Sequence, residues 1–150
     1  MQGDRNKILV ESIKRLLRRD ALHNLKKIVD KTHAADLSRV FDFLTLPDQH
    51  KLFKMISDKE QKGVLFSEME EDTFLEFAEG LELEEFVSIL ESMPNDDVAD
   101  IIGRLPDERS DEILQRIVSR SRERAGLHEV TELSELPRVL RTKGLEIGGR

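Results

Sequence analysis

Three aspartates near the start of a predicted helix are the side chains of this sequence best placed for chemistry. Asp96 and Asp97 follow Pro94, and Asp100 comes one helical turn after Asp96. The apolar residues of this stretch recur at the spacing of one helix face: Val98, Ile101, Ile102 and Leu105. Asp96 and Asp100 therefore lie on the opposite, solvent-facing side, about one turn apart. Two carboxylates held in this way are candidates for binding a cation.

The same carboxylates also suit a helix start that binds nothing. Acidic side chains in the first turn are favoured by the helix macrodipole and by capping, whatever the function of the protein. Both interpretations stay open on the residues alone. Catalysis is disfavoured, because the sequence has no Gly-rich phosphate loop, no nucleophile elbow and no triad-like order of His, Ser and Asp.

The charge distribution limits the class of partner. The chain has 150 residues and a formal net charge of −7, but residues 1–33 carry nine Lys and Arg against four Asp and Glu. Residues 57–112 carry nineteen acidic side chains against four basic ones. Such an acidic surface repels nucleic acid and attracts cations or a basic partner. We therefore expect no nucleic-acid partner.

Features that the sequence lacks predict the cellular compartment of the protein. There is no cysteine, no signal-peptide pattern and no run of about 18 apolar residues in the sequence. We expect a cytoplasmic protein that does not insert into a membrane.

Helical periodicity runs through most of the chain, and no strand-like alternation competes with it. Asp20 is a candidate N-cap, and Ser57 and Glu60 have the spacing of a capping box. The seven phenylalanines fall between Phe41 and Phe86, in helical register, and are expected in the core. The pattern predicts an all-α fold of about nine or ten short helices joined by turns.

Two segments match each other at an offset of 61 residues. The matched pairs are Asp36/Asp97, Leu37/Val98, Val40/Ile101, Phe41/Ile102, Leu44/Leu105, Leu52/Ile113, Phe53/Leu114 and Ile56/Ile117. Short helices with internal repetition are typical of stacked helix pairs, and predict a right-handed α-superhelix or compact α-solenoid. We expect residues 1–119 to form this domain and residues 120–150 to form a tail with one short helix at about 135–143, acting as a cap or a linker.

Four segments together resemble a known family. They are His-Ala-Ala-Asp at 33–36, Leu-Phe-Lys-Met-Ile at 52–56, Val-Leu at 64–65, and the stretch 93–106 with its Asp-Asp-Val-Ala-Asp. Their order and spacing resemble the cytoplasmic N domain of the magnesium transporter MgtE, over roughly residues 8–118. That family typically has Glu before Val-Leu, where this chain has Gly63.

The resemblance implies a non-enzymatic regulatory domain that senses Mg²⁺. In such transporters the N domain packs against a CBS-domain pair when carboxylates on both sides share Mg²⁺, and this closes the channel. Carried onto the matching motif, the metal ligands are Asp96 and Asp100, with Asp97 as their neighbour. Because Mg²⁺ keeps several waters, one or two carboxylates per ion suffice, and isolated surface carboxylates should give only weak binding. The implied partner is a CBS-domain or membrane transporter protein.

A second hypothesis assumes the same fold but no metal binding. Flagellar motor switch proteins use similar stacked helices for protein contacts, so the chain could be a metal-independent α-solenoid scaffold for protein–protein interaction. Its concave face would then bind a helix or a basic segment of a partner.

Overall fold

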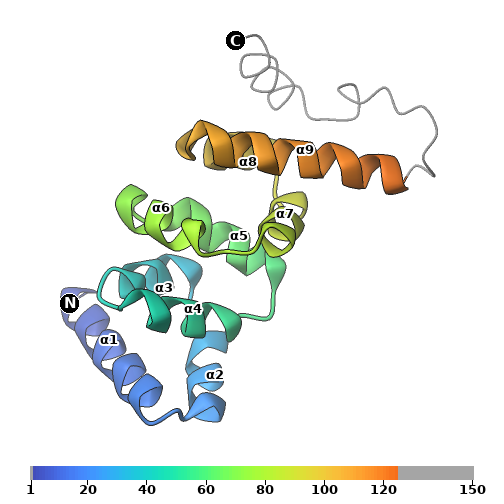
Figure 1. Ribbon diagram of the computed structural model, residues 1–150. Helices are drawn as coiled ribbons and strands as arrows, with labels where there is room; N and C mark the ends of the chain where they lie inside the picture. The colour runs from blue at the N-terminus through green and yellow to red at the C-terminus, as the bar shows by residue number, and fades with distance from the viewer. Residues whose placement is uncertain (1, 125–150) are drawn as a thin grey trace. The chain divides into compact units, whose positions relative to one another are not determined.

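The computed structural model describes residues 2–124, with side chains from residue 5 onward, and it confirms the all-α prediction over this range. No strand occurs among these residues (Figure 1). The helices are α1 (Gln2–Arg18), α2 (Leu22–Asp30), α3 (Ala34–Phe41), α4 (Leu46–Lys54), α5 (Lys59–Glu68), α6 (Glu71–Glu79), α7 (Leu83–Glu91), α8 (Asn95–Arg104) and α9 (Asp107–Arg124). None of these described helices is both long enough and apolar enough to cross a bilayer.

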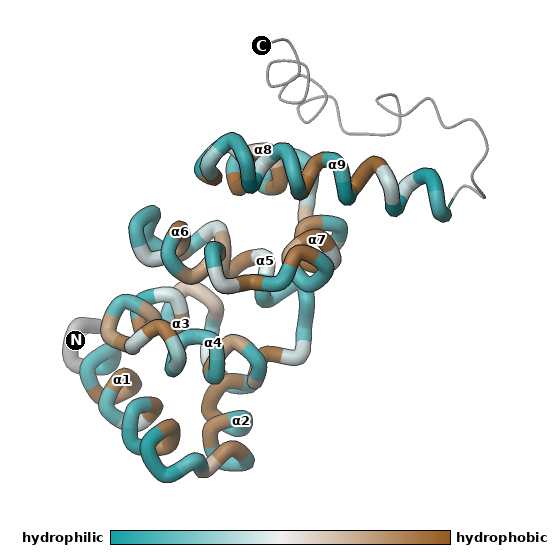
Figure 2. The backbone as a smooth tube through the Cα atoms, in the orientation of Figure 1, coloured by the Kyte–Doolittle hydropathy of each residue, from teal (hydrophilic) through white to brown (hydrophobic). Residues whose placement is uncertain are grey.

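The described part of the chain divides into two compact units, which meet between Leu81 and Glu82. In the first unit, α1 packs against α2, α3 and α4, while α3 packs against α5 and α4 against α6. In the second unit, α7 packs against α9. Brown and teal alternate along the helices in Figure 2, as expected when each helix buries one face.

Aromatic rings fill the centre of the first unit. Phe53 contacts Phe66 and Phe77, with ring centroids 5.7 and 4.9 Å apart, and Phe77 also meets the edge of Phe41 at 5.5 Å. Phe74 contacts Phe66 at 5.5 Å. All five side chains are fully buried, and each contributes about 1.5–3 kcal/mol relative to an exposed ring. This cluster joins α3, α4, α5 and α6.

The 61-residue repeat is confirmed and extends further than the sequence comparison found. The starts of α3 and α8, at Ala34 and Asn95, are separated by this offset. So are the starts of α4 and α9, and those of α2 and α7 at Leu22 and Leu83. Helices α2–α4 and α7–α9 therefore begin at the same spacing along the chain, and we call each set a three-helix module.

A buried polar contact recurs in both modules. In the first, Nε2 of Gln49 on α4 donates a hydrogen bond to the carbonyl oxygen of Phe41 at 2.9 Å. In the second, the hydroxyl of Ser110 on α9 donates to the carbonyl oxygen of Ile102, also at 2.9 Å. Each contact joins a side chain to a backbone carbonyl eight residues earlier, so it ties together the two helices of a pair.

Two of the expected helix starts differ in detail. The cap of α5 is Asp58, whose Oδ1 accepts a hydrogen bond from the backbone N–H of Glu60 at 3.0 Å, and not Ser57. The N-cap of α2 is Ala21, and Asp20 adopts a left-handed backbone conformation with φ of 55°. Aspartate is among the residues that tolerate this conformation, so Asp20 turns the chain and does not cap the helix.

The division at residue 119 stays a prediction. Helix α9 continues past that point to Arg124. The short helix expected at about 135–143 lies outside the described residues.

Candidate functional site

The predicted carboxylates open α8 as the periodicity indicated. Asp96 and Asp97 lie in the first turn of α8, after the extended N-cap residue Pro94. Val98 and Ile101 are buried, whereas Asp96 and Asp100 are exposed and Asp97 is half-buried. The structure therefore confirms that Asp96 and Asp100 lie on the solvent side of the helix.

These side chains are not engaged by the described part of the protein. Within residues 5–124, no hydrogen bond or ion pair involves the carboxylates of Asp96, Asp97 or Asp100. Arg104 lies one turn after Asp100 and makes no ion pair with it in this range. No group of three or more His, Cys, Asp or Glu side chains in the same range is arranged to hold a metal ion. Asp96 and Asp100 therefore belong to no such group within the described residues.

The 61-residue repeat shows whether the fold requires carboxylates at the positions of Asp96 and Asp100. The residues of α3 that correspond to Asp96 and Asp100 are Ala35 and Arg39. Both modules form the same helices, so carboxylates at these two positions are not a requirement of the fold. Asp36, which corresponds to Asp97, forms an ion pair with Arg39 at 3.2 Å.

Helix capping explains only part of the acidic start. The macrodipole acts within the first turn, which contains Asp96 and Asp97. Asp100 lies beyond that turn and gains little from it. The helix start therefore accounts for Asp96 and Asp97, whereas Asp100 is an exposed polar residue on the solvent face of α8.

The arginines of α9 neutralise glutamates of α7. Glu84 accepts hydrogen bonds from Nε and Nη2 of Arg116 at 2.6 and 3.0 Å, and from Arg120 at 3.3 Å. Glu91 pairs with Arg120 at 3.1 Å and with Arg124 at 3.3 Å. The hydrogen bond from Arg116 lowers the pKa of the Glu84 carboxyl below its ordinary value of 4.5, and the same contact raises the pKa of Arg116. Within residues 5–124, these arginines pair with α7 and within α9, and none of them forms an ion pair with Asp96, Asp97 or Asp100.

Gly63 lies in α5 and is buried, so α5 offers no carboxylate at this position. The acidic side chains of α6, by contrast, are exposed: Glu71, Asp72, Glu76 and Glu79. They surround no metal-binding group in the described range. This agrees with a solvated face.

The core assignment was wrong for one phenylalanine. Phe43 is 60% exposed, whereas the other six phenylalanines are fully buried or nearly so. It follows α3 in the turn before Thr45, between the buried residues Phe41 and Leu44. Phe41 and Leu44 occupy the face that points into the core, so the side chain of Phe43 points away from it. The spacing of these residues in the sequence could have predicted this exposure.

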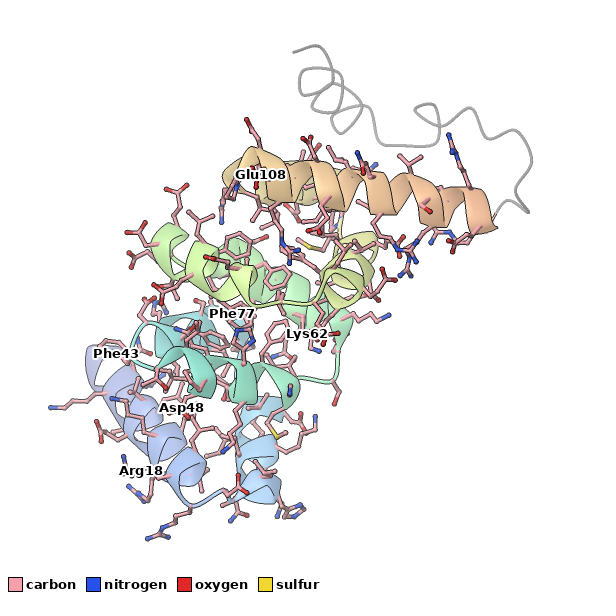
Figure 3. The ribbon with its side chains drawn as sticks, in the orientation of Figure 1. Arg18, Phe43, Asp48, Lys62, Phe77 and Glu108 are labelled. Atoms are coloured by element: carbon pink, nitrogen blue, oxygen red, sulfur yellow. The ribbon has the colours of Figure 1, made fainter. Side chains whose placement is uncertain are left out.

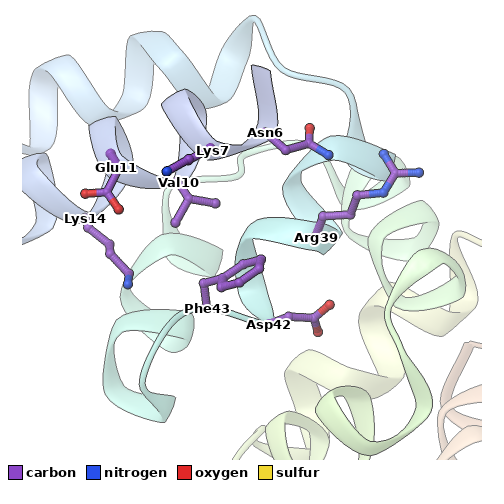
Figure 4. Close-up of a pocket in the computed structure, with 8 residues that line it drawn as sticks. All are labelled: Asn6, Lys7, Val10, Glu11, Lys14, Arg39, Asp42 and Phe43. Carbon is purple, nitrogen blue, oxygen red and sulfur yellow. The ribbon is translucent and has the colours of Figure 1, made fainter. Parts of the chain in front are cut away.

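Phe43 lies beside a cavity of about 710 Å³ in the first unit (Figure 4). The α1 side is lined by Asn6, Lys7, Val10, Glu11 and Lys14. The opposite side is formed by Arg39, Asp42 and Phe43. We call this cavity the α1–α3 groove. The sequence hypotheses did not include it.

Comparison with known proteins points to one family. The family model described as the MgtE intracellular N domain matches residues 32–132, more than half of the chain. A solved structure, described as the soluble part of a magnesium transporter, is similar, with a TM-score of 0.67 and 15% sequence identity. The similarity covers 85% of this chain and 51% of that one, so this chain spans about half its length. A search of curated proteins found no match.

Proposed function

The chain belongs to the family of the MgtE intracellular N domain, and we propose that it is a Mg²⁺-responsive regulatory domain that docks on a partner. Members of this family are non-catalytic, which agrees with the lack of catalytic motifs. In this proposal Asp96 and Asp100 bind Mg²⁺ weakly from α8, with Asp97 beside them, and the partner supplies further ligands. We propose a cytoplasmic location for it.

The main support for this proposal is the exposure and the lack of ion pairing of the α8 carboxylates among the described residues. Asp96 and Asp100 are exposed, one turn apart, and without a cationic partner among the described residues. Two unit charges about 6 Å apart repel each other by roughly 1–3 kcal/mol near a protein surface. A bound divalent cation removes that repulsion, and its remaining positions stay open to water or to ligands from a second surface.

The choice of partner follows from the family. We propose that the partner is a CBS-domain or membrane transporter protein, since the matching structure is the soluble part of a magnesium transporter and this chain spans about half of it. A shared site of this kind would couple docking to the Mg²⁺ concentration, because the ion binds the docked state more tightly than the free domain. We also propose that residues 1–119 form the domain that docks and residues 120–150 a cap or linker.

The test is an amide-resolved NMR titration with Mg²⁺ at constant ionic strength, from about 0.1 mM to about 20 mM, the range of weak divalent sites. We expect saturable shifts centred on residues 95–101 in the unaltered chain. Asp96→Asn/Asp100→Asn should abolish them. The matched control is Asp72→Asn/Glu76→Gln, which removes two exposed carboxylates at the same spacing from α6 and should leave the α8 shifts intact.

A uniform, non-saturating drift over all acidic helices would contradict binding by the domain alone. In that case the titration is repeated with the CBS-domain protein present. If the complex also fails to respond in an Asp96- and Asp100-dependent way, the Mg²⁺ proposal is wrong, and the metal-independent interaction scaffold remains.

A further inference from the structure

Three arginines at the end of α1 form an exposed cationic surface. Arg15, Arg18 and Arg19 are exposed, and their side chains make no hydrogen bond or ion pair within residues 5–124. Glu11 lies one turn before Arg15 and does not pair with it in this range. Arg18 lies at the outer edge of the first unit (Figure 3). We call the three arginines the α1 arginine face.

The end of α6 has the opposite charge at the corresponding positions. Helices α1 and α6 end at Arg18 and Glu79, which are separated by the 61-residue offset of the repeat. Arg15 corresponds to Glu76 in the same way, so each helix has two like charges three residues apart. Glu76 and Glu79 are exposed, and we call them the α6 acidic face.

The fold does not require acidic side chains at the end of α6. Ile13 of α1 and Phe74 of α6 correspond and are both fully buried, so the two helices use the same inward face while their outward faces differ in charge. Carboxylates in the last turn are unfavourable, because they lie at the negative end of the helix macrodipole. Glu76 and Glu79 lie there, and no cation within residues 5–124 pairs with them. A cationic partner would remove this penalty.

The arginine face and the acidic face of one molecule do not meet. Helix α1 packs on α3 and α4, and α6 packs on α4, so α3 and α4 lie between α1 and α6 (Figure 1). A contact between the two faces therefore requires two copies of the chain.

We propose that the α1 arginine face of one copy docks on the α6 acidic face of a second copy. Arginine suits this contact, because its guanidinium can donate two parallel hydrogen bonds to one carboxylate. A guanidinium at the end of α6 also complements the negative pole of that helix. The contact uses neither the α8 carboxylates nor a metal ion, so it is independent of the proposed function.

A second copy complements both faces, whereas other partners complement one. An anionic bilayer would meet the arginines and leave Glu76 and Glu79 without a cation. A basic peptide would meet these glutamates and leave the arginines unpaired. Because the contact consists of exposed charges, the association should be weak and should decrease as salt is added.

The test is sedimentation velocity of the 150-residue chain between about 10 μM and about 500 μM, which spans weak self-association. In about 50 mM NaCl we expect association with a Kd of about 0.1–1 mM. In about 500 mM NaCl the affinity should be at least about fivefold lower, because the Debye length becomes shorter than the contact.

Charge reversal tests both faces. Arg15→Glu/Arg18→Glu and Glu76→Arg/Glu79→Arg should each weaken the self-association at least about tenfold. An equimolar mixture of the two variants should associate, because each supplies the face that complements the other. The chain that carries all four substitutions should associate like the unaltered chain.

The matched control variant is Lys27→Glu/Lys31→Glu, which makes the same change in net charge as Arg15→Glu/Arg18→Glu, at exposed positions in and after α2. It should change the affinity by less than about threefold. Circular dichroism and the melting temperature of each variant establish that the fold is kept. Glu76→Arg/Glu79→Arg should stabilise α6, because cations suit the end of a helix, so unfolding would not explain its loss of association.

Three results would overturn the proposal. The first is a chain that stays monomeric at about 500 μM in about 50 mM NaCl. The second is an equal effect of Arg15→Glu/Arg18→Glu and of the control variant on the self-association. The third is a mixture of the two charge-reversed variants that stays monomeric.

Discussion

At the scale of single residues, Gly80 shows how a close approach restricts one position. A Cβ atom added there would lie 2.7 Å from Nε2 of His50. The His50 ring is stacked on Phe77 with centroids 4.4 Å apart, so it cannot move away without losing this contact. We expect Gly80→Ala to lower the free energy of unfolding by about 1 kcal/mol. Urea denaturation measures this change.

Gly103 provides the internal control for that prediction. A Cβ atom added there meets nothing within 4 Å, and the residue lies exposed in α8. Because alanine is the better helix former, Gly103→Ala should raise the free energy of unfolding by about 0.5 kcal/mol. Equal effects of the two substitutions would show that the His50 contact does not matter.

Residue-level predictions from the sequence were right where one geometric rule applies. The spacing of Val98 and Ile101 placed Asp96 and Asp100 on the solvent side, because helix periodicity alone decides this. The sequence alone did not distinguish between local structures of similar energy, such as two possible helix caps. Asp58 and the neighbouring Ser57 are both good caps, and only the backbone geometry selects between them.

At the scale of elements, the contact between α7 and α9 should make stability depend on pH. The hydrogen bond from Arg116 lowers the pKa of the Glu84 carboxyl in the folded state. Its stabilising contribution is therefore complete above the ordinary value of 4.5 and is lost as the pH falls through the lower folded-state pKa.

We expect Glu84→Gln to destabilise the protein at neutral pH, and this difference from the unaltered chain to shrink in acid. The measurement is the free energy of unfolding of both proteins from about pH 7 to about pH 3. Glu82→Gln is the control, because Glu82 is exposed and its side chain makes no capping hydrogen bond. A difference that stays constant with pH would contradict the role of the Arg116 hydrogen bond.

The 61-residue repeat shows which correspondences between helices could be predicted from the sequence. Apolar spacing predicted the correspondence of α3 with α8, because matched core positions keep matched residue types. The correspondence of α2 with α7 was missed, since only their buried positions agree, as in Leu25 and Phe86, and their surfaces differ. The α1–α3 groove was missed because it depends on two helices meeting, which periodicity within one helix does not specify.

At the scale of the whole molecule, charge is the property that the sequence predicts most directly. The net charge of −7 and the acidic excess over residues 57–112 imply mutual repulsion in the folded protein. Raising NaCl from about 20 mM to about 200 mM shortens the Debye length from roughly 20 Å to about 7 Å. We expect the melting temperature to rise by about 2–5 °C over this range. A fall would mean that attraction to the basic residues 1–33 outweighs the repulsion.

The same salt response distinguishes general screening from a specific magnesium site. Asp96→Asn/Asp100→Asn and Asp72→Asn/Glu76→Gln each remove two exposed negative charges, so both should reduce the response to NaCl by a similar amount. At matched ionic strength, Mg²⁺ should raise the melting temperature further only where the α8 pair is intact, because a bound ion stabilises the folded state by mass action. If the two variants lose the Mg²⁺ effect equally, the acidic surface attracts the ion diffusely, and α8 holds no site of its own.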